Sequence, residues 1–128
     1  MRIVIETVPH KLNRNGQVGD YKYLHDGTLY ITVSELGNDD MNWLVALHEM
    51  IEERISKSDG ISEPEINDWD AYYEKKREMG LVPTESENGF AYDCIYKKHH
   101  TVSTGIEMVL AALLEVDWND YNDTINKL

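Results

Sequence analysis

The chain has 128 residues, 41% of them hydrophobic and 28% charged, which is typical of one globular domain with a single core. Its 24 acidic and 12 basic residues give a formal net charge of −12, which disfavours binding to the phosphate backbone of nucleic acids. The longest apolar run, Met108 to Leu114, is too short to span a bilayer and the first residues lack a signal-like segment, so we expect a cytoplasmic protein without membrane contact.

Three strands are expected in residues 1–35. Arg2–Val8 is rich in β-branched residues. Tyr21–Leu24 and Thr28–Val33 flank an Asp26-Gly27 pair, which is typical of a tight hairpin. We therefore expect a three-stranded antiparallel sheet in this part of the chain.

Residues 40–128 are expected to be the helical part of the same domain, 1–128. A first helix, capped by Asn38 and Asp39, should end near Lys57. A second should begin at Ser62 with a capping box. A third should span Lys97–Val116, before a short helix that starts near Trp118. The core face expected for the third helix consists of Val102, Ile106, Val109, Leu110 and Leu113. The predicted fold is α+β, with the sheet packed on a bundle of three main helices.

The single cysteine, Cys94, excludes a disulfide framework and a zinc site made of thiolates. We interpret Cys94 as a small buried hydrophobic residue.

The first helix carries a histidine and a carboxylate on its apolar face. On a helical wheel, His48 lies in the middle of that face and Glu52 lies beside it, one turn further on. The apolar residues of this face are Leu44, Val45, Leu47, Ile51 and Ile55. Burying an unpaired carboxylate costs several kcal/mol, and a metal ion would compensate because residues i and i+4 point the same way.

Together with Glu49, these residues read His-Glu-x-x-Glu. This is a variant of the His-Glu-x-x-His zinc signature, in which two ligands lie one turn apart and the intervening glutamate activates water. The motif predicts His48 and Glu52 as ligands of zinc or another divalent metal, and Glu49 as a general base. A buried hydrogen-bonded pair of His48 and Glu52, without metal, fits the same pattern.

A zinc ion normally needs a third protein ligand, and Asp70, His100 and Glu107 qualify. A second carboxylate suits zinc less well than an imidazole, and Asp70 also fits a hydrogen bond to a tyrosine. We therefore choose His100 as the third ligand, with Glu107 or Asp70 as the carboxylate that orients it.

Several of these runs resemble a group of small uncharacterised bacteriophage proteins. The resemblance implies a phage or prophage origin and brings no established activity with it. The runs that carry it are Leu44 to Glu52, Gly60-Ile61-Ser62, Asp68-x-Asp70, Tyr96 to His100, Thr104 to Glu107 and Val116-Asp117-Trp118.

The chain also resembles, more distantly, the zincin metalloproteases, which place a small sheet before a metal-binding helix and lay the substrate along the edge strand. The resemblance implies that His48 is a ligand, that Glu49 is the general base, and that Glu52 replaces the second histidine. This replacement is a departure, since a carboxylate ligand weakens zinc as a Lewis acid.

Our leading hypothesis is a zincin-like metal-binding phage protein that hydrolyses peptide bonds of a peptide or protein substrate with zinc. The runner-up is a non-enzymatic, small acidic interaction protein that binds a host factor or mimics DNA, with a buried His48–Glu52 pair. The oligomeric state is left open by the sequence.

Overall fold

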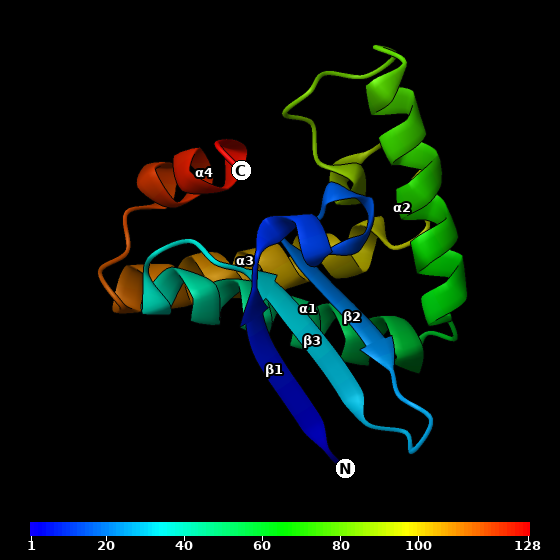
Figure 1. The fold of residues 1–128 in the computed structure, drawn as a ribbon, viewed down its shortest axis with the longest axis horizontal. Helices are drawn as coiled ribbons and strands as arrows, with labels where there is room; N and C mark the ends of the chain where they lie inside the picture. Colours follow the sequence, from blue (N-terminus) through cyan, green and yellow to red (C-terminus); the bar gives the residue numbers. More distant parts are fainter.

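A three-stranded sheet and four α-helices make up the computed structural model, which describes residues 1–128 (Figure 1). The predicted α+β class is confirmed. The elements in chain order are β1 (Ile3–Val8), the 3₁₀ turns η1 (His10–Leu12) and η2 (Arg14–Gly16), β2 (Gly19–Tyr23), β3 (Leu29–Ser34), α1 (Asp39–Ser58), α2 (Glu63–Glu78), the 3₁₀ turn η3 (Asn88–Phe90), α3 (Lys97–Leu113) and α4 (Trp118–Asn126).

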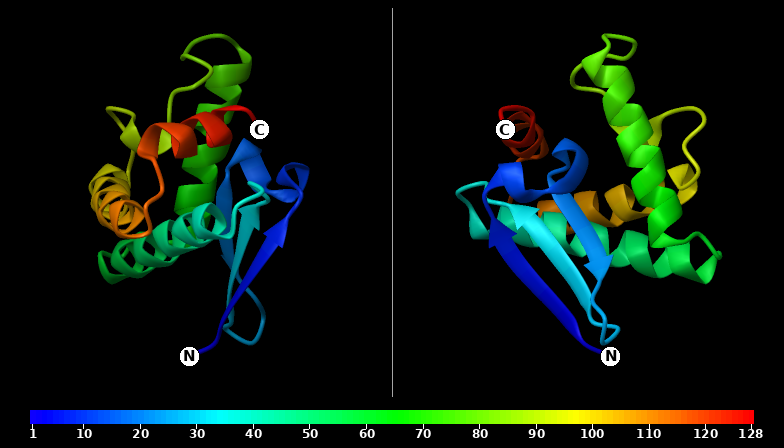
Figure 2. Two further views of the ribbon diagram at one scale, coloured as in Figure 1. Left: turned by 90° about the vertical axis from the view of Figure 1, so that its left-hand side faces the viewer. Right: turned by 45° about the vertical axis from the view of Figure 1, so that its right-hand side comes forward.

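The sheet is mixed, so the prediction of an all-antiparallel sheet was wrong. Its strand order is β1-β3-β2, with β2 antiparallel and β1 parallel to β3. The hairpin fixes β2 on one edge of β3, and the connection through η1 and η2 leaves the opposite edge to β1. Alternate residues of β3 (Leu29, Ile31 and Val33) are buried towards α1, whereas no helix covers the other face (Figure 2).

Helices α1 and α3 lie side by side and run in opposite directions (Figures 1 and 2). The hydroxyl of Ser103 donates to the carbonyl of His48 at 2.6 Å, and His99 pairs with Asp59 at the other end of the contact. Helix α1 begins as expected, because the side chain of Asn38 accepts a hydrogen bond from the backbone of Met41.

Helix α2 crosses the α1–α3 pair instead of packing along it, so no three-helix bundle is formed (Figure 1). Its predicted capping box is confirmed, with Ser62 and Glu65 bonded to each other's backbone groups. Few of its residues are buried, chiefly Ile66 and Tyr73. Helices α2 and α4 therefore form walls above the α1–α3 pair.

The predicted core face of α3 was also wrong for most of its residues. Val102, Ile106, Val109 and Leu113 are exposed to solvent, and only Leu110 of that set is partly buried. The helix turns three polar residues, His99, Ser103 and Glu107, inward instead, and Ala111 continues this buried row into the hydrophobic core. The physical reason is that α1 presents His48 and Glu52 to α3, and these polar groups need polar partners.

The structure also bears on the cysteine and on membrane-spanning segments. The only cysteine, Cys94, is free and buried, as expected. No helix of the structure is both long and apolar enough to cross a lipid bilayer.

Candidate metal centre

His48, Glu52 and His100 meet at one point between α1 and α3. Glu52 Oε2 lies 3.2 Å from His48 Nε2 and 2.8 Å from His100 Nδ1, and the two nitrogens are 3.1 Å apart. All three side chains are nearly buried, with exposed fractions of 10%, 6% and 12% in the same order. The three residues that the sequence predicts as ligands are thus brought together.

Each histidine uses its other ring nitrogen to contact a carboxylate outside this point. His48 Nδ1 lies 2.7 Å from Glu107 Oε2, and His100 Nε2 lies 3.0 Å from Glu87 Oε2. Glu107 therefore orients His48, not His100 as expected, and the carboxylate next to His100 is Glu87. Imidazoles that bind metals commonly donate their second N–H to a carboxylate in this way, which fixes the ring and its tautomer.

The donor set fits zinc in composition and in spacing. Two imidazole nitrogens and one carboxylate oxygen form a His₂Glu set, which is found in catalytic zinc sites that keep a fourth position open. Ligand atoms about 2.1 Å from a tetrahedral zinc ion lie about 3.4 Å apart. Separations of 2.8 to 3.2 Å need to grow by about 0.2 to 0.6 Å to reach that value.

Without a metal, protons hold this cluster together. Burial lowers the pKa of His100, but hydrogen bonds to Glu52 and Glu87 outweigh burial and raise that pKa to about 9. Burial opposes charge on His48 as well, yet its bonds to Glu107 and Glu52 keep its pKa well above the ordinary value. Burial raises the pKa of Glu52, but the two histidines outweigh this and lower it to about 2. A metal cation would replace the protons on the nitrogens that face Glu52.

Glu49 lies next to the cluster on α1, and its pKa is shifted in the opposite direction from that of Glu52. Burial, followed by the charge of Glu52, raises the pKa of Glu49 to about 8. Its side chain packs against Gly19 of β2, where a Cβ atom would overlap the carboxyl group. A carboxyl group whose pKa is near neutrality, beside a candidate metal site, can accept and return a proton.

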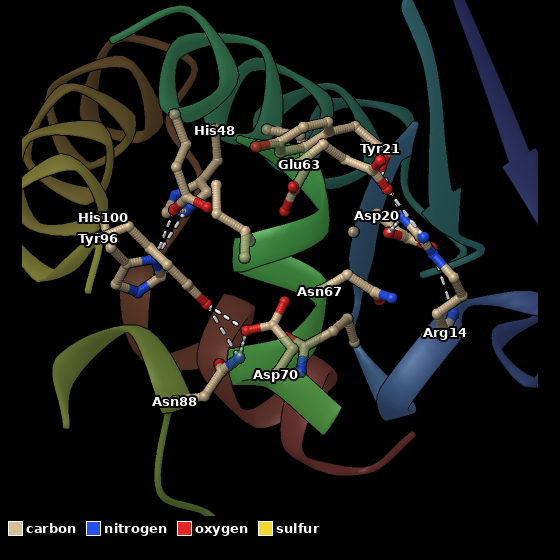
Figure 3. A pocket seen from close by; sticks show the side chains of 15 residues that line it. Arg14, Asp20, Tyr21, His48, Glu63, Asn67, Asp70, Asn88, Tyr96 and His100 are labelled. Atoms are coloured by element: carbon tan, nitrogen blue, oxygen red, sulfur yellow. Dashed lines mark hydrogen bonds and ion pairs between the residues drawn. The ribbon is translucent and has the colours of Figure 1, made fainter. Parts of the chain in front are cut away.

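These side chains line a small pocket of about 40 Å³ between α1, α2, β2 and η3 (Figure 3). His48 and His100 lie on one side of the pocket, and Arg14 lies on the opposite side. Arg14 pairs with Asp20 at 2.8 Å and with Glu63 at 2.9 Å. The wall opposite the cluster is therefore a closed network of charges.

Asp70 also lines this pocket but lies outside the three-residue cluster. It accepts hydrogen bonds from the hydroxyl of Tyr96 and from the side chain of Asn88, each at 2.5 Å. Burial raises the pKa of Asp70 to about 7. The sequence left two roles open for Asp70, one at the metal site and one in a hydrogen bond to a tyrosine. The structure has the hydrogen bond to a tyrosine.

A wider cleft of about 550 Å³, open to solvent, adjoins the pocket. Its floor includes His48, Glu49 and His100, and its sides come from η2, α2, the segment 84–88 and α4. The candidate metal centre is therefore reached from a cleft large enough for an extended chain segment.

Two glycines that the sequence does not single out make room for the site. A Cβ atom at Gly89 would overlap the ring of His100, just as one at Gly19 would overlap Glu49. Glu87 and Tyr121, whose hydroxyl donates to Glu107 at 2.5 Å, were also missed as parts of the site. Glu87 has no local signal, because it lies in the loop between α2 and α3.

Comparisons with protein-family models, with curated proteins and with solved structures find no match for this chain.

Proposed function

We propose that this chain is a zincin-like, zinc-dependent hydrolase of peptide bonds, of bacteriophage origin. The observation that carries the proposal is the convergence of His48 Nε2, His100 Nδ1 and Glu52 Oε2, while the outer nitrogen of each histidine contacts a carboxylate. This arrangement meets the requirements of a zinc site in ligand type, ligand number and orientation of the rings. The phage origin rests on the sequence resemblance alone.

Zinc at this site would polarise a substrate carbonyl and lower the pKa of an attacking water. His48, Glu52 and His100 would hold it, with Glu107 and Glu87 fixing the two rings. Glu49 lies beside the ligands, and we assign it the proton transfer: it accepts the proton of the water and delivers it to the leaving amine. A pKa near 8 in the metal-free protein is compatible with a carboxyl group that gains and loses a proton during turnover.

The free edge of β2 supports a peptide as the substrate. The backbone of Val18 and of Leu24 bonds to β3, so the alternate residues Gly19, Tyr21 and Tyr23 direct their backbone groups away from β3. On this edge the carbonyl of Tyr21 already accepts a hydrogen bond from Arg14. The remaining backbone groups can pair with an extended peptide, as edge strands do in many peptide complexes.

Glu52 replaces the second histidine of the zincin motif in the sequence, but the composition of the ligand set in the structure is unchanged by it. Because His100 comes from α3, the complete set is again two histidines and one glutamate. What differs is the position of the carboxylate, which is on the motif helix and not on a later element.

Metal analysis of protein purified without chelator tests the proposal. We expect about one zinc ion per chain, and a higher melting temperature when zinc is added to chelator-treated protein, because a ligand that binds the native state stabilises it. The zinc-loaded protein should cleave an unfolded protein such as casein, and the chelator-treated protein should not. Metal content near zero, with no thermal stabilisation by zinc, overturns the proposal.

One observation favours the non-enzymatic alternative. Glu52 already accepts hydrogen bonds from both histidines, so the chain can satisfy this buried carboxylate by itself. An acidic interaction protein with a buried His48–Glu52 pair needs no metal. For that function, His48→Ala would leave partner binding unchanged and zinc would leave the melting temperature unchanged.

A further inference from the structure

An uncovered apolar face lies on the side of α1 and α3 that points away from the pocket. On α3 it consists of Val102, Ile106, Val109 and Leu113, of which Val109 and Leu113 are 62% and 74% exposed. On α1 it consists of Trp43, Leu47 and Ile51, and Trp43 is half exposed. No other element covers this side of the two helices in the left view of Figure 2. We call these seven residues, with the charged residues described next, the outer face.

The two rows of the outer face adjoin each other. On the helical wheel of α3, Ile106 lies between exposed Val102 and inward Ser103, which bonds to α1. On α1, Ile51 lies between half-buried Leu47 and inward His48. Both rows therefore flank the same α1–α3 contact, and together they form one continuous two-helix surface.

Charges stand at the two ends of the outer face, with opposite signs. Helix α1 carries Asp40 at one end and Arg54 at the other, in line with its apolar row. Because α3 runs in the opposite direction, its Lys98 lies at the same end as Arg54. Both basic side chains are well exposed, Arg54 to 55% and Lys98 to 76%. Lys98 is paired with Asp59 at 3.1 Å, so the α1 row carries the charge contrast, with Arg54 at one end, Asp40 at the other and apolar residues between them.

We propose that the outer face binds a second copy of this chain, with the helices of the two copies antiparallel. A two-fold axis perpendicular to α1 brings the positive end of each copy onto the negative end of the other. Along α1 the spacing is symmetric about Leu47: Asp40 meets Arg54 of the second copy, Trp43 meets Ile51 of the second copy, and Leu47 meets its own equivalent. Rows spaced by three and four residues pack in this way in antiparallel helix pairs.

Charge and size both favour a second copy over an unrelated partner. The outer face is nearly neutral although the chain has a formal net charge of −12, so self-association places little like charge in contact. Two adjacent helices present a surface about 20 Å wide and about 25 Å long. This is about 500 Å² in projection for each copy, or about 1,000 Å² in total, which is the size of weak and reversible interfaces.

Sedimentation velocity of the full chain, from about 1 µM to about 200 µM, tests the proposal across the micromolar range. We expect a monomer–dimer equilibrium, and Val109→Glu should raise the dimer dissociation constant at least about tenfold because it buries a charge. Leu81→Glu is the matched control: Leu81 is 65% exposed, in the loop after α2, and its replacement should leave the constant unchanged. Circular dichroism verifies that both variants fold.

A charge exchange distinguishes a second copy from any other partner. Arg54→Glu should weaken the dimer several-fold, because it places like charges together. Adding Asp40→Arg to the same chain should restore the wild-type constant to within about twofold, since the two signs are then exchanged across the two-fold axis. A monomer at every concentration, an unchanged constant for Val109→Glu, or a double variant as weak as Arg54→Glu overturns the proposal. Zinc content is measured independently, so this result and that for the metal centre stay separate.

Discussion

His48 and Glu107 are joined across the α1–α3 contact: Nδ1 of the imidazole lies 2.7 Å from Oε2 of the carboxylate. Glu107 also accepts a hydrogen bond from Tyr121 through its other oxygen, so this carboxylate is itself held in place. The pair leaves Nε2 of His48 facing Glu52 and His100. Glu107 therefore has the position of a group that orients a metal ligand without binding the metal.

Glu107→Gln should lower zinc affinity about 10- to 100-fold, the usual effect of losing a carboxylate that orients a ligand. His100→Ala removes a ligand and should lower it considerably more. Titration with zinc against a competing chelator measures both variants.

His99→Ala is the control for this ranking. His99 is adjacent in sequence and buried, but it bonds to Asp59 and not to the cluster. Its loss should leave zinc affinity near that of the wild type. An affinity for His99→Ala below that for His100→Ala contradicts the assignment of the third ligand.

Glu49→Gln should abolish peptide cleavage while leaving zinc content and folding intact. The amide keeps the shape of the side chain against Gly19 but cannot accept the proton of the water. Casein cleavage and metal analysis of the same preparation provide the measurement. Loss of zinc from this variant would mean that Glu49 is a ligand, and full activity would exclude it as the base.

The sequence predicts the elements well where the signal is local. Asn38 and the Ser62–Glu65 capping box mark two helix starts by bonds within four residues, and both are found. The direction of β1 relative to β3 has no such signal, because the pairing of distant strands depends on the path of the connection between them.

The metal-ligand cluster and the exposed face of α3 differ in how well helical periodicity predicts them. The phase of His48, Glu52 and His100 on their helices is enough to predict that they point inward, and they do meet. The same method fails for Val102 and Val109, since periodicity shows that a helix has an apolar face but not whether that face is covered. Glu87 could not be predicted at all, because its position depends on a loop.

Gly89→Ala should lower zinc affinity by displacing the ring of His100, which occupies the space that a Cβ atom would need. We expect at least a tenfold loss, since a ligand moved from its position binds poorly. Gly105→Ala is the control, because nothing lies within 4 Å of a Cβ atom there. That variant should retain full affinity and gain up to about 1 kcal/mol of stability from helix propensity.

Asp70→Asn should stabilise the metal-free protein at pH 8 and leave the cluster intact. Burial raises the pKa of Asp70 to about 7, so its contribution to stability is fully present below its ordinary pKa and is lost as the pH rises through 7. Asparagine does not ionise and can still accept the hydrogen bond from Tyr96. The melting temperature of the variant should exceed that of the wild type by a few degrees at pH 8 and by less at pH 5. If zinc binding is lost instead, Asp70 belongs to the metal site.

Zinc binding should strengthen with rising pH between about 6 and 8.5, because the ion must displace protons from His48 and His100. Hydrogen bonds to Glu52 and Glu87 outweigh burial and raise the pKa of His100 to about 9, so its nitrogen is still protonated at neutral pH in the metal-free protein. Each displaced proton makes the affinity increase up to about tenfold per pH unit, and two protons up to about a hundredfold.

Zinc affinity should rise with pH, whereas the free energy of unfolding of the metal-free protein should fall. A raised histidine pKa stabilises fully below the ordinary value of 6.5, and this contribution is lost as the pH rises through 9. The increase in melting temperature that zinc produces should therefore grow from pH 6 to pH 8.5. His100→Ala should weaken both trends, because it removes one of the two titrating imidazoles together with a ligand, while His48 still titrates. An increase that is the same at every pH would show that zinc binds elsewhere than at these imidazoles.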